Sequence, residues 1–175
     1  MIHLIIDGYN LIRQVASLSR HESKSLEAGR SQLIKLLSEY KKIKRHKITV
    51  VFDGALNLSE FAPAYHEAGI AIRFSPESKS ADDIIKEIVR EEKDRALVVT
   101  SDQSICSFAK QHKSSVLGSP QFYDKLLMAH AMVDLDKSPL EKQEPAHKRW
   151  MTYKKGPSRR APKKERKHKH RAKKL

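Results

Sequence analysis

Short apolar runs alternate along the chain with longer segments in which apolar residues recur every three or four positions. The runs cover residues 2–6, 47–52, 70–74 and 96–100, with a shorter one near residue 116. The periodic segments are residues 25–44, a stretch that opens at residue 80, residues 103–111 and residues 119–132. Continuous apolar runs are typical of strands buried on both faces, and their alternation with helices indicates a parallel sheet. We therefore expect a three-layer α/β/α domain with a central, mostly parallel sheet over residues 1–135, in which residues 55–69 form a loop.

The composition changes at residue 136. The chain has 35 Lys and Arg and 21 Asp and Glu, which gives a formal net charge of +14. Residues 137–175 contain 16 of the Lys and Arg but only 3 of the Asp and Glu, so most of the net charge lies there. This segment also has four prolines and almost no aliphatic side chains, so it lacks the apolar surface that offsets the entropy of ordering. We expect residues 136–175 to form a basic, mostly disordered tail.

Other features exclude whole classes of protein. No run of 18 apolar residues is present, which excludes a membrane-spanning helix, and residues 1–6 lack the flanking charges of a signal peptide. The single cysteine, Cys106, excludes a disulfide framework and a cysteine-based zinc site. Signatures of nucleotide-binding loops and of serine-hydrolase nucleophiles are absent. These observations fit a cytoplasmic protein that does not contact a membrane.

Four aspartates occupy equivalent places in the predicted fold. Asp7, Asp53 and Asp102 each end a predicted strand, and Asp82 lies in the first turn of a predicted helix. Strand carboxyl ends and the following helix starts share one edge of an open α/β sheet, where ligands bind. Carboxylates gathered there repel one another unless a cation such as Mg²⁺ or Mn²⁺ neutralises them, which is the requirement of metal-assisted phosphodiester hydrolysis. Each aspartate alone is also an ordinary turn or N-cap residue.

Asp82 is a better candidate than its neighbour Asp83. With about 100° per residue, Asp82 lies a quarter turn from the centre of the helix's apolar face, whereas Asp83 lies nearly opposite that face. Ser80 and Asp83 also form a capping-box pattern. We expect Asp82 to face the sheet edge and Asp83 to cap the helix.

Three further residues near this edge have two interpretations each. Asn10 can orient a carboxylate or a phosphate, or cap a turn or helix. Ser101 can donate a hydrogen bond to the acids or cap the following helix. Arg30, near the start of the first long helix, can hold a substrate phosphate or pair with one of the acids.

Four segments in order carry a family resemblance. Residues 5–12 (IIDGYNLI) and 50–54 (VVFDG) resemble the first two motifs of the NYN domains, a branch of the PIN-like nuclease superfamily. Residues 80–85 (SADDII) and 98–102 (VVTSD) resemble the third and fourth motifs. The order and spacing are most similar to the YacP-like family, over about residues 1–134.

The resemblance implies a PIN-like fold and divalent-metal-dependent cleavage of RNA. The family's acidic residues fall on Asp7, Asp53, Asp82 and Asp102, and Asn10 accompanies the first of them. One characterised activity in the family is that of a ribosome-associated endoribonuclease that cuts mRNA. A ribosome-binding role for the basic tail does not follow from the resemblance.

The tail's chemistry favours RNA as a partner, either mRNA or rRNA. Lys and Arg neutralise phosphates without regard to sequence, and Trp150 adds an aromatic face that can stack on a base. We expect RNA contacts from the tail at Lys148, Arg149, Trp150, Arg159, Arg160, Lys163 and Lys164. The basic end of the first long helix, residues 41–45, is a further candidate. A solubilising tail and a nuclear-localisation signal are alternatives.

The sequence therefore favours a metal-dependent endoribonuclease that acts on RNA, with the ribosome as a candidate partner. One alternative is a non-catalytic RNA- or ribosome-binding module of the same fold, which needs none of the four acids. Another is a phosphatase or a DNA-directed nuclease of the same superfamily. The oligomeric state does not follow from the sequence.

Overall fold

The computed structural model describes residues 1–54 and 64–137, the last five by their backbone only. Its centre is a six-stranded sheet in the order β3-β4-β2-β1-β5-β6. Five strands are mutually parallel: β1 (His3–Asp7), β2 (Lys47–Phe52), β4 (Ile70–Phe74), β5 (Ala96–Val99) and β6 (Ser115–Leu117). The predicted α/β/α architecture with a mostly parallel sheet is confirmed.

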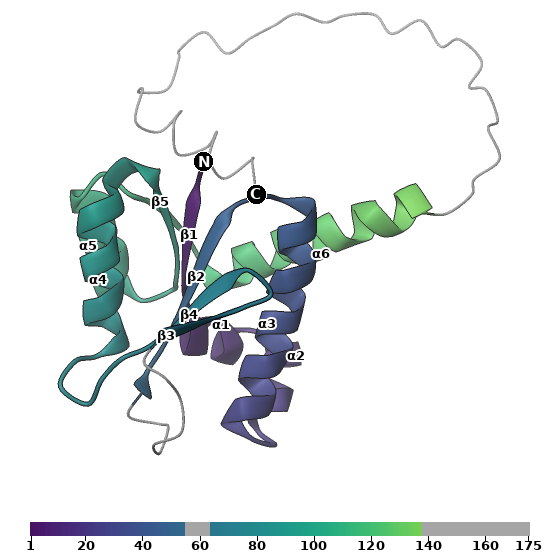
Figure 1. The fold of residues 1–175 in the computed structure, drawn as a ribbon, viewed down its shortest axis with the longest axis horizontal. Helices are drawn as coiled ribbons and strands as arrows, with labels where there is room; N and C mark the ends of the chain where they lie inside the picture. The colour runs from purple at the N-terminus through teal and green to yellow at the C-terminus, as the bar shows by residue number, and fades with distance from the viewer. Residues whose placement is uncertain (55–63, 138–175) are drawn as a thin grey trace, which may run out of the picture.

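Helices cover both faces of the sheet, as Figure 1 shows. One face carries α1 (Gly8–Gln14), α2 (Ala16–Glu22), α3 (Leu26–Ile43) and α6 (Ser119–Lys137), and the other carries α4 (Ala81–Glu92) and α5 (Gln103–Gln111). A 3-10 turn (Lys93–Arg95) joins α4 to β5. Alternate residues of β1 enter separate cores, because Leu4 and Ile6 pack with the first group of helices and Ile5 packs with the second.

One strand contradicts the expected loop at residues 55–69. Strand β3 (Ala64–Glu67) pairs antiparallel with β4 at the edge of the sheet. The connecting turn has positive φ at Ala68 (49°) and Gly69 (77°). Strand β3 is mostly exposed, so its formation depends on backbone pairing with β4 rather than on an apolar run, and the hydrophobic pattern carries no signal for it.

The helices also differ from the pattern in two places. The short helices α1 and α2 lie in a region where no helix is predicted. Helix α6 continues through Lys137, beyond residue 132, where the predicted helix ends. The predicted disorder of residues 138–175 lies outside the described residues. Among the described residues, no helix is both long enough and apolar enough to cross a membrane.

Candidate active site

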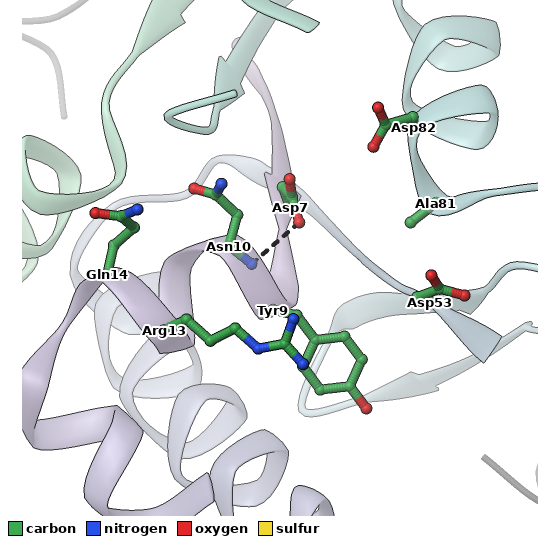
Figure 2. Close-up of a pocket in the computed structure, with 8 residues that line it drawn as sticks. All are labelled: Asp7, Tyr9, Asn10, Arg13, Gln14, Asp53, Ala81 and Asp82. Atoms are coloured by element: carbon green, nitrogen blue, oxygen red, sulfur yellow. Dashed lines mark hydrogen bonds between the residues drawn. The ribbon is translucent and has the colours of Figure 1, made fainter. Parts of the chain in front are cut away.

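Three of the four predicted acids line one pocket. Asp7 ends β1, Asp53 follows β2 and Asp82 lies in the first turn of α4, and together they border a cavity of about 290 Å³. The remaining lining residues are Tyr9, Asn10, Arg13, Gln14 and Ala81. Figure 2 shows Asp7 between Asn10 on one side and Asp53 and Asp82 on the other. The carboxyl end of the sheet therefore brings together carboxylates that are far apart in the sequence.

The Asp7 carboxylate is held at both oxygens. Its Oδ1 accepts a hydrogen bond from the backbone N–H of Asn10 (3.2 Å), which makes Asp7 the N-cap of α1. Its Oδ2 accepts a hydrogen bond from the Thr100 hydroxyl (3.1 Å). Burial raises the pKa of Asp7 to about 6, the charges of Asp82 and Asp102 add to this, and the two hydrogen bonds oppose it.

Asp53 is positioned by a close approach of the backbone. Its Oδ1 accepts a hydrogen bond from the Ser75 hydroxyl (3.2 Å), which also accepts one from the N–H of Gly54 (2.9 Å). A Cβ atom on Gly54 would lie 1.9 Å from the Ser75 carbonyl oxygen. Similarly, a Cβ atom on Gly8 would lie 2.3 Å from the Phe52 ring. Both Asp-Gly pairs thus need glycine because the chain after each strand packs against a neighbour without room for a side chain.

Asp82 and its neighbour Asp83 face different surroundings. Asp82 lines the pocket, and burial, followed by the charge of Asp102, raises its pKa. Asp83 forms a capping box with Ser80, whose hydroxyl and backbone N–H both donate to Asp83 Oδ2 (2.8 and 3.1 Å). These bonds lower the pKa of Asp83. The helical geometry expected from the sequence matches this division.

Asp102 differs from the other three acids. Its Oδ1 caps α5 by accepting the backbone N–H groups of Ser104 (2.8 Å) and Ile105 (3.0 Å). It is not among the residues that line the pocket. Its charge still reaches the site, since it raises the pKa of both Asp7 and Asp82. Asp102 therefore caps α5 and also acts on the pocket through its charge.

Asn10 joins three segments behind the pocket. Its Oδ1 accepts hydrogen bonds from the backbone N–H of Ser101 (2.9 Å) and from the hydroxyl of Ser119 (2.8 Å). The Ser101 hydroxyl in turn accepts the backbone N–H of Ser119 (3.3 Å). Asn10 therefore connects α1 to the β5–α5 loop and to the start of α6. Ser101 binds the start of α6, whereas α5 is capped by Asp102.

Thr100 is a site residue that the sequence reasoning missed. It is fully buried, and its hydroxyl donates to Asp7 Oδ2 while accepting the backbone N–H of Asp102 (3.1 Å). One hydroxyl thus couples two of the predicted acids. Its place directly before Ser101 and Asp102, at the end of a predicted strand, was the available signal.

The structure places Arg30, a predicted site residue, behind the pocket and places Arg13 at its edge. Arg30 is only 9% exposed, donates from Nη1 to the Tyr9 hydroxyl (3.0 Å), and lies 5.5 Å from the centre of the Phe74 ring. It does not line the pocket, whereas Arg13, which was not predicted, does. Arg13 lies one helical turn after Asn10, a spacing that could have identified it.

The other predicted RNA contacts lie elsewhere. Residues 41–45 are at the end of α3, next to the start of β2, where Lys47 pairs with His3 at the opposite end of β1 from Asp7. Lys41 donates its ammonium group to the carbonyl of Gly69. The tail residues Lys148, Arg149, Trp150, Arg159, Arg160, Lys163 and Lys164 lie outside the described residues.

The donor set fits a divalent cation in its chemistry. Three carboxylates border one pocket, and the charge of Asp82 contributes to the raised pKa of Asp7, a repulsion that a hard cation relieves. Within residues 1–54 and 64–137, no three His, Cys, Asp or Glu side chains are gathered closely enough to hold an ion as they stand. Mg²⁺ is usually held by one or two carboxylates and keeps several waters, so a site here does not need all three acids in direct contact with the ion.

Comparisons with known proteins agree with the fold and the motifs. The chain is similar to the crystal structure of Rae1 (YacP) from Bacillus subtilis, with a TM-score of 0.65, 22% identity and coverage of 78% of this chain and 79% of the other. A mutant of that protein gives a TM-score of 0.67, 20% identity and coverage of 77% and 80%. A search of curated proteins returned no match.

A family match extends further along the chain than the four motifs. The model of the YacP-like NYN domain matches residues 4–169 and so includes most of the basic segment as well as all four aspartates. With nearly the whole chain matched, the protein belongs to the YacP-like NYN domain family, a branch of the PIN-like nucleases.

Proposed function

We propose that this protein is an endoribonuclease that depends on Mg²⁺ or Mn²⁺ and hydrolyses RNA phosphodiester bonds at the pocket lined by Asp7, Asp53 and Asp82. The observation that carries the proposal is the convergence of these three carboxylates in one cavity. Membership of a nuclease family supports hydrolysis of a phosphodiester bond, and the excess of basic residues supports an RNA substrate.

In this proposal Asp7, Asp53 and Asp82 hold the cation. When bound, it supplies positive charge that polarises the scissile phosphate. Thr100 and the N–H of Asn10 fix the Asp7 carboxylate, so that it does not reorganise when substrate arrives. Asp102 adds negative charge from the start of α5. Hydrolysis on the side of the 3′-oxygen leaves a 5′-phosphate on the downstream fragment.

The basic segment after α6 has a separate part in the proposal. Residues 137–175 carry 16 Lys and Arg, and the family match runs through residue 169. Such a segment binds RNA phosphates with an affinity that falls as salt rises. We assign it the delivery of RNA, including mRNA on ribosomes in the cytoplasm, to the pocket.

The decisive experiment is cleavage of mixed cellular RNA by the full chain, with and without translating ribosomes. Each reaction contains Mg²⁺ or Mn²⁺ or an excess of EDTA. We expect cuts that need the cation, yield 5′-phosphates and disappear in Asp7→Asn. Asp83→Asn is the matched control, because it removes the same charge one residue from Asp82 but outside the pocket, and it retains cleavage.

A readout independent of activity is the melting temperature with and without the cation. Binding to the folded state alone raises it, and we expect a smaller rise in Asp7→Asn than in Asp83→Asn. Cleavage that survives in Asp7→Asn refutes the assignment of the site. If RNA binding is sensitive to salt and no sample shows cleavage, the nuclease proposal is wrong, and the protein is a non-catalytic RNA- or ribosome-binding module.

A further inference from the structure

The pocket has two chemically different sides. Asp53 and Asp82 lie on one side, and helix α1 contributes Arg13 and Gln14 on the other. Figure 2 shows the Arg13 side chain extending from α1 in front of the Tyr9 ring, toward the side on which Asp53 lies. A positive side chain thus faces a cavity that three carboxylates also border.

Arg13 is held in place from two directions. Its Nε donates to Glu22 Oε1 at 3.1 Å, and its guanidinium lies 5.2 Å from the centre of the Tyr9 ring. Glu22 is well shielded, with a side chain only 12% exposed. A guanidinium that is stacked and bonded at Nε loses less rotamer entropy when it binds a ligand than a free side chain does.

Tyr9, which supports Arg13, is itself fixed from behind. The residue is 5% exposed, and its ring packs edge-on against Phe52 at a centroid distance of 5.2 Å. Its hydroxyl accepts the hydrogen bond from the buried Arg30. Arg30 therefore acts on the pocket indirectly, through the aromatic ring on which Arg13 rests.

The outer part of the Arg13 guanidinium is available to a ligand. Within the described part of the chain, the Arg13 interactions are the Nε bond to Glu22 and the contact with Tyr9, so both Nη groups have no hydrogen-bond partner there. The Arg13 side chain is 54% exposed. Two parallel N–H groups of this kind match the geometry of two phosphate oxygens.

We propose that Arg13 binds a backbone phosphate of the RNA next to the scissile one. This inference rests on the proposed function, because it places the scissile phosphate beside the carboxylates. Arg13 then holds the strand on the α1 side of the pocket and sets which bond lies beside Asp7. It is the substrate contact that the sequence assigned to Arg30.

The test is a double-mutant cycle between protein and substrate, with the full chain and a short single-stranded RNA. In a set of substrates, one phosphate at a time is replaced by an uncharged methylphosphonate. We expect Arg13→Gln to lower kcat/KM by about 10- to 100-fold, chiefly through KM. At one position flanking the cut, the methylphosphonate lowers wild-type cleavage by a similar factor and does not weaken Arg13→Gln further.

Three variants separate binding from folding and from general charge. Arg20→Gln removes an exposed positive charge from α2 outside the pocket, and its effect is additive with every methylphosphonate. Arg13→Lys retains part of the activity, because it keeps the charge and loses the planar fork. Glu22→Gln breaks the ion pair but keeps Arg13, so it preserves the coupling even where its melting temperature falls.

Failure of this inference is distinguishable from failure of the nuclease proposal. If the wild-type protein cleaves RNA and Arg13→Gln is additive with every methylphosphonate, Arg13 does not contact a substrate phosphate and the inference is wrong. If the wild-type protein cleaves nothing, the same cycle is measured on Kd. Coupling in the Kd values would show that Arg13 binds a phosphate in a non-catalytic binding module. Additivity at every position would refute the proposed contact between Arg13 and a phosphate.

Discussion

The hydroxyl of Thr100 donates a hydrogen bond to Oδ2 of Asp7 across 3.1 Å, although the two residues are 93 positions apart in the sequence. They are brought together because β5 lies beside β1 in the sheet. The same hydroxyl accepts the N–H of Asp102. A single buried side chain thus orients the carboxylate of Asp7 and also holds the backbone of Asp102, where helix α5 begins.

Replacement of Thr100 by Val keeps the shape of the side chain and removes these hydrogen bonds. The N–H of Asp102 and Oδ2 of Asp7 lose a partner, so we expect a loss of about 1–3 kcal/mol in the free energy of unfolding. Because the Thr100 bond lowers the pKa of Asp7, that pKa should rise above its present value of about 6. Urea denaturation and carboxyl-carbon NMR titration measure the two effects. Thr100→Ser is the control that restores the hydroxyl, and equal stability of Val and Ser would contradict the prediction.

Because the pKa of Asp7 is raised in the folded protein, ionisation of Asp7 lowers the free energy of unfolding. An ordinary aspartate has a pKa near 3.8, whereas that of Asp7 in the folded protein is about 6. The stability associated with protonated Asp7 is fully present below about pH 4 and is lost as the pH rises through 6. In EDTA, Asp7→Asn should therefore be more stable than wild type at pH 7.5, by about 1–3 kcal/mol. The difference should shrink below pH 6 and vanish near pH 4.

The measurement is a series of denaturation curves for both proteins between pH 4 and pH 8. EDTA is required because a bound cation stabilises ionised Asp7 and hides the effect. A difference in stability that does not change with pH would show that Asp7 titrates normally in the folded protein.

Asp82 and Asp83 should respond differently to the same substitution. Asp83→Asn weakens the capping box of α4 and should lower the melting temperature at neutral pH. The pKa of Asp83 is lowered in the folded protein. The difference in melting temperature should therefore disappear as the pH falls below the pKa of an ordinary aspartate and then through the lower pKa of Asp83. Asp82→Asn removes a carboxylate whose pKa is raised, so it should not destabilise the protein at neutral pH. Of these two variants, only Asp82→Asn should lose cleavage. Melting and cleavage assays on both variants measure the two effects. Cleavage retained in Asp82→Asn but lost in Asp83→Asn would contradict the assignment.

Gly54 should not tolerate a side chain. A Cβ atom there would lie 1.9 Å from the Ser75 carbonyl oxygen, so Gly54→Ala must displace the chain that carries Asp53. We expect a loss of about 1–3 kcal/mol in the free energy of unfolding and a loss of cleavage. Gly118→Ala is the matched control, because its Cβ atom would lie 3.8 Å from the nearest atom, and its stability should change by less than about 0.5 kcal/mol. Similar results for the two variants would contradict this account of the Asp-Gly pair.

Much of the fold and part of the site could be predicted from local patterns. Buried strands of a parallel sheet are continuous apolar runs, and the polar residue after such a run lies at the carboxyl edge. This places Asp7 and Asp53 at the pocket without knowledge of any contact. Helical periodicity distinguishes Asp82 from Asp83 for the same reason, because the angle between neighbouring residues on a helix is constant.

The same patterns were insufficient where a contact joins different elements. Arg13 and Arg30 are both basic residues on helices near the acidic edge. The spacing of Arg13 from Asn10 could have made it a candidate, but no local pattern shows which of the two arginines is buried. Arg30 is buried because α3 packs it against Tyr9 and Phe74, while Arg13 lies at the pocket because α1 begins at the end of β1. Strand β3 was missed because it pairs through its backbone at an exposed edge, which leaves little trace in the side chains.

The amino-acid sequence is enough to place the five parallel strands and helices α3 to α6, the edge at which the acids meet and the basic character of the last 39 residues. These features follow from periodicity, turn chemistry and charge, which are properties of neighbouring residues. Three outcomes instead depend on the folded chain: Thr100 holds Asp7, Asp102 caps α5 without lining the pocket, and Arg13 rather than Arg30 lines it. Those outcomes depend on which elements pack together, because a hydrogen bond or a stacked ring is set by distances of a few ångströms between distant parts of the chain.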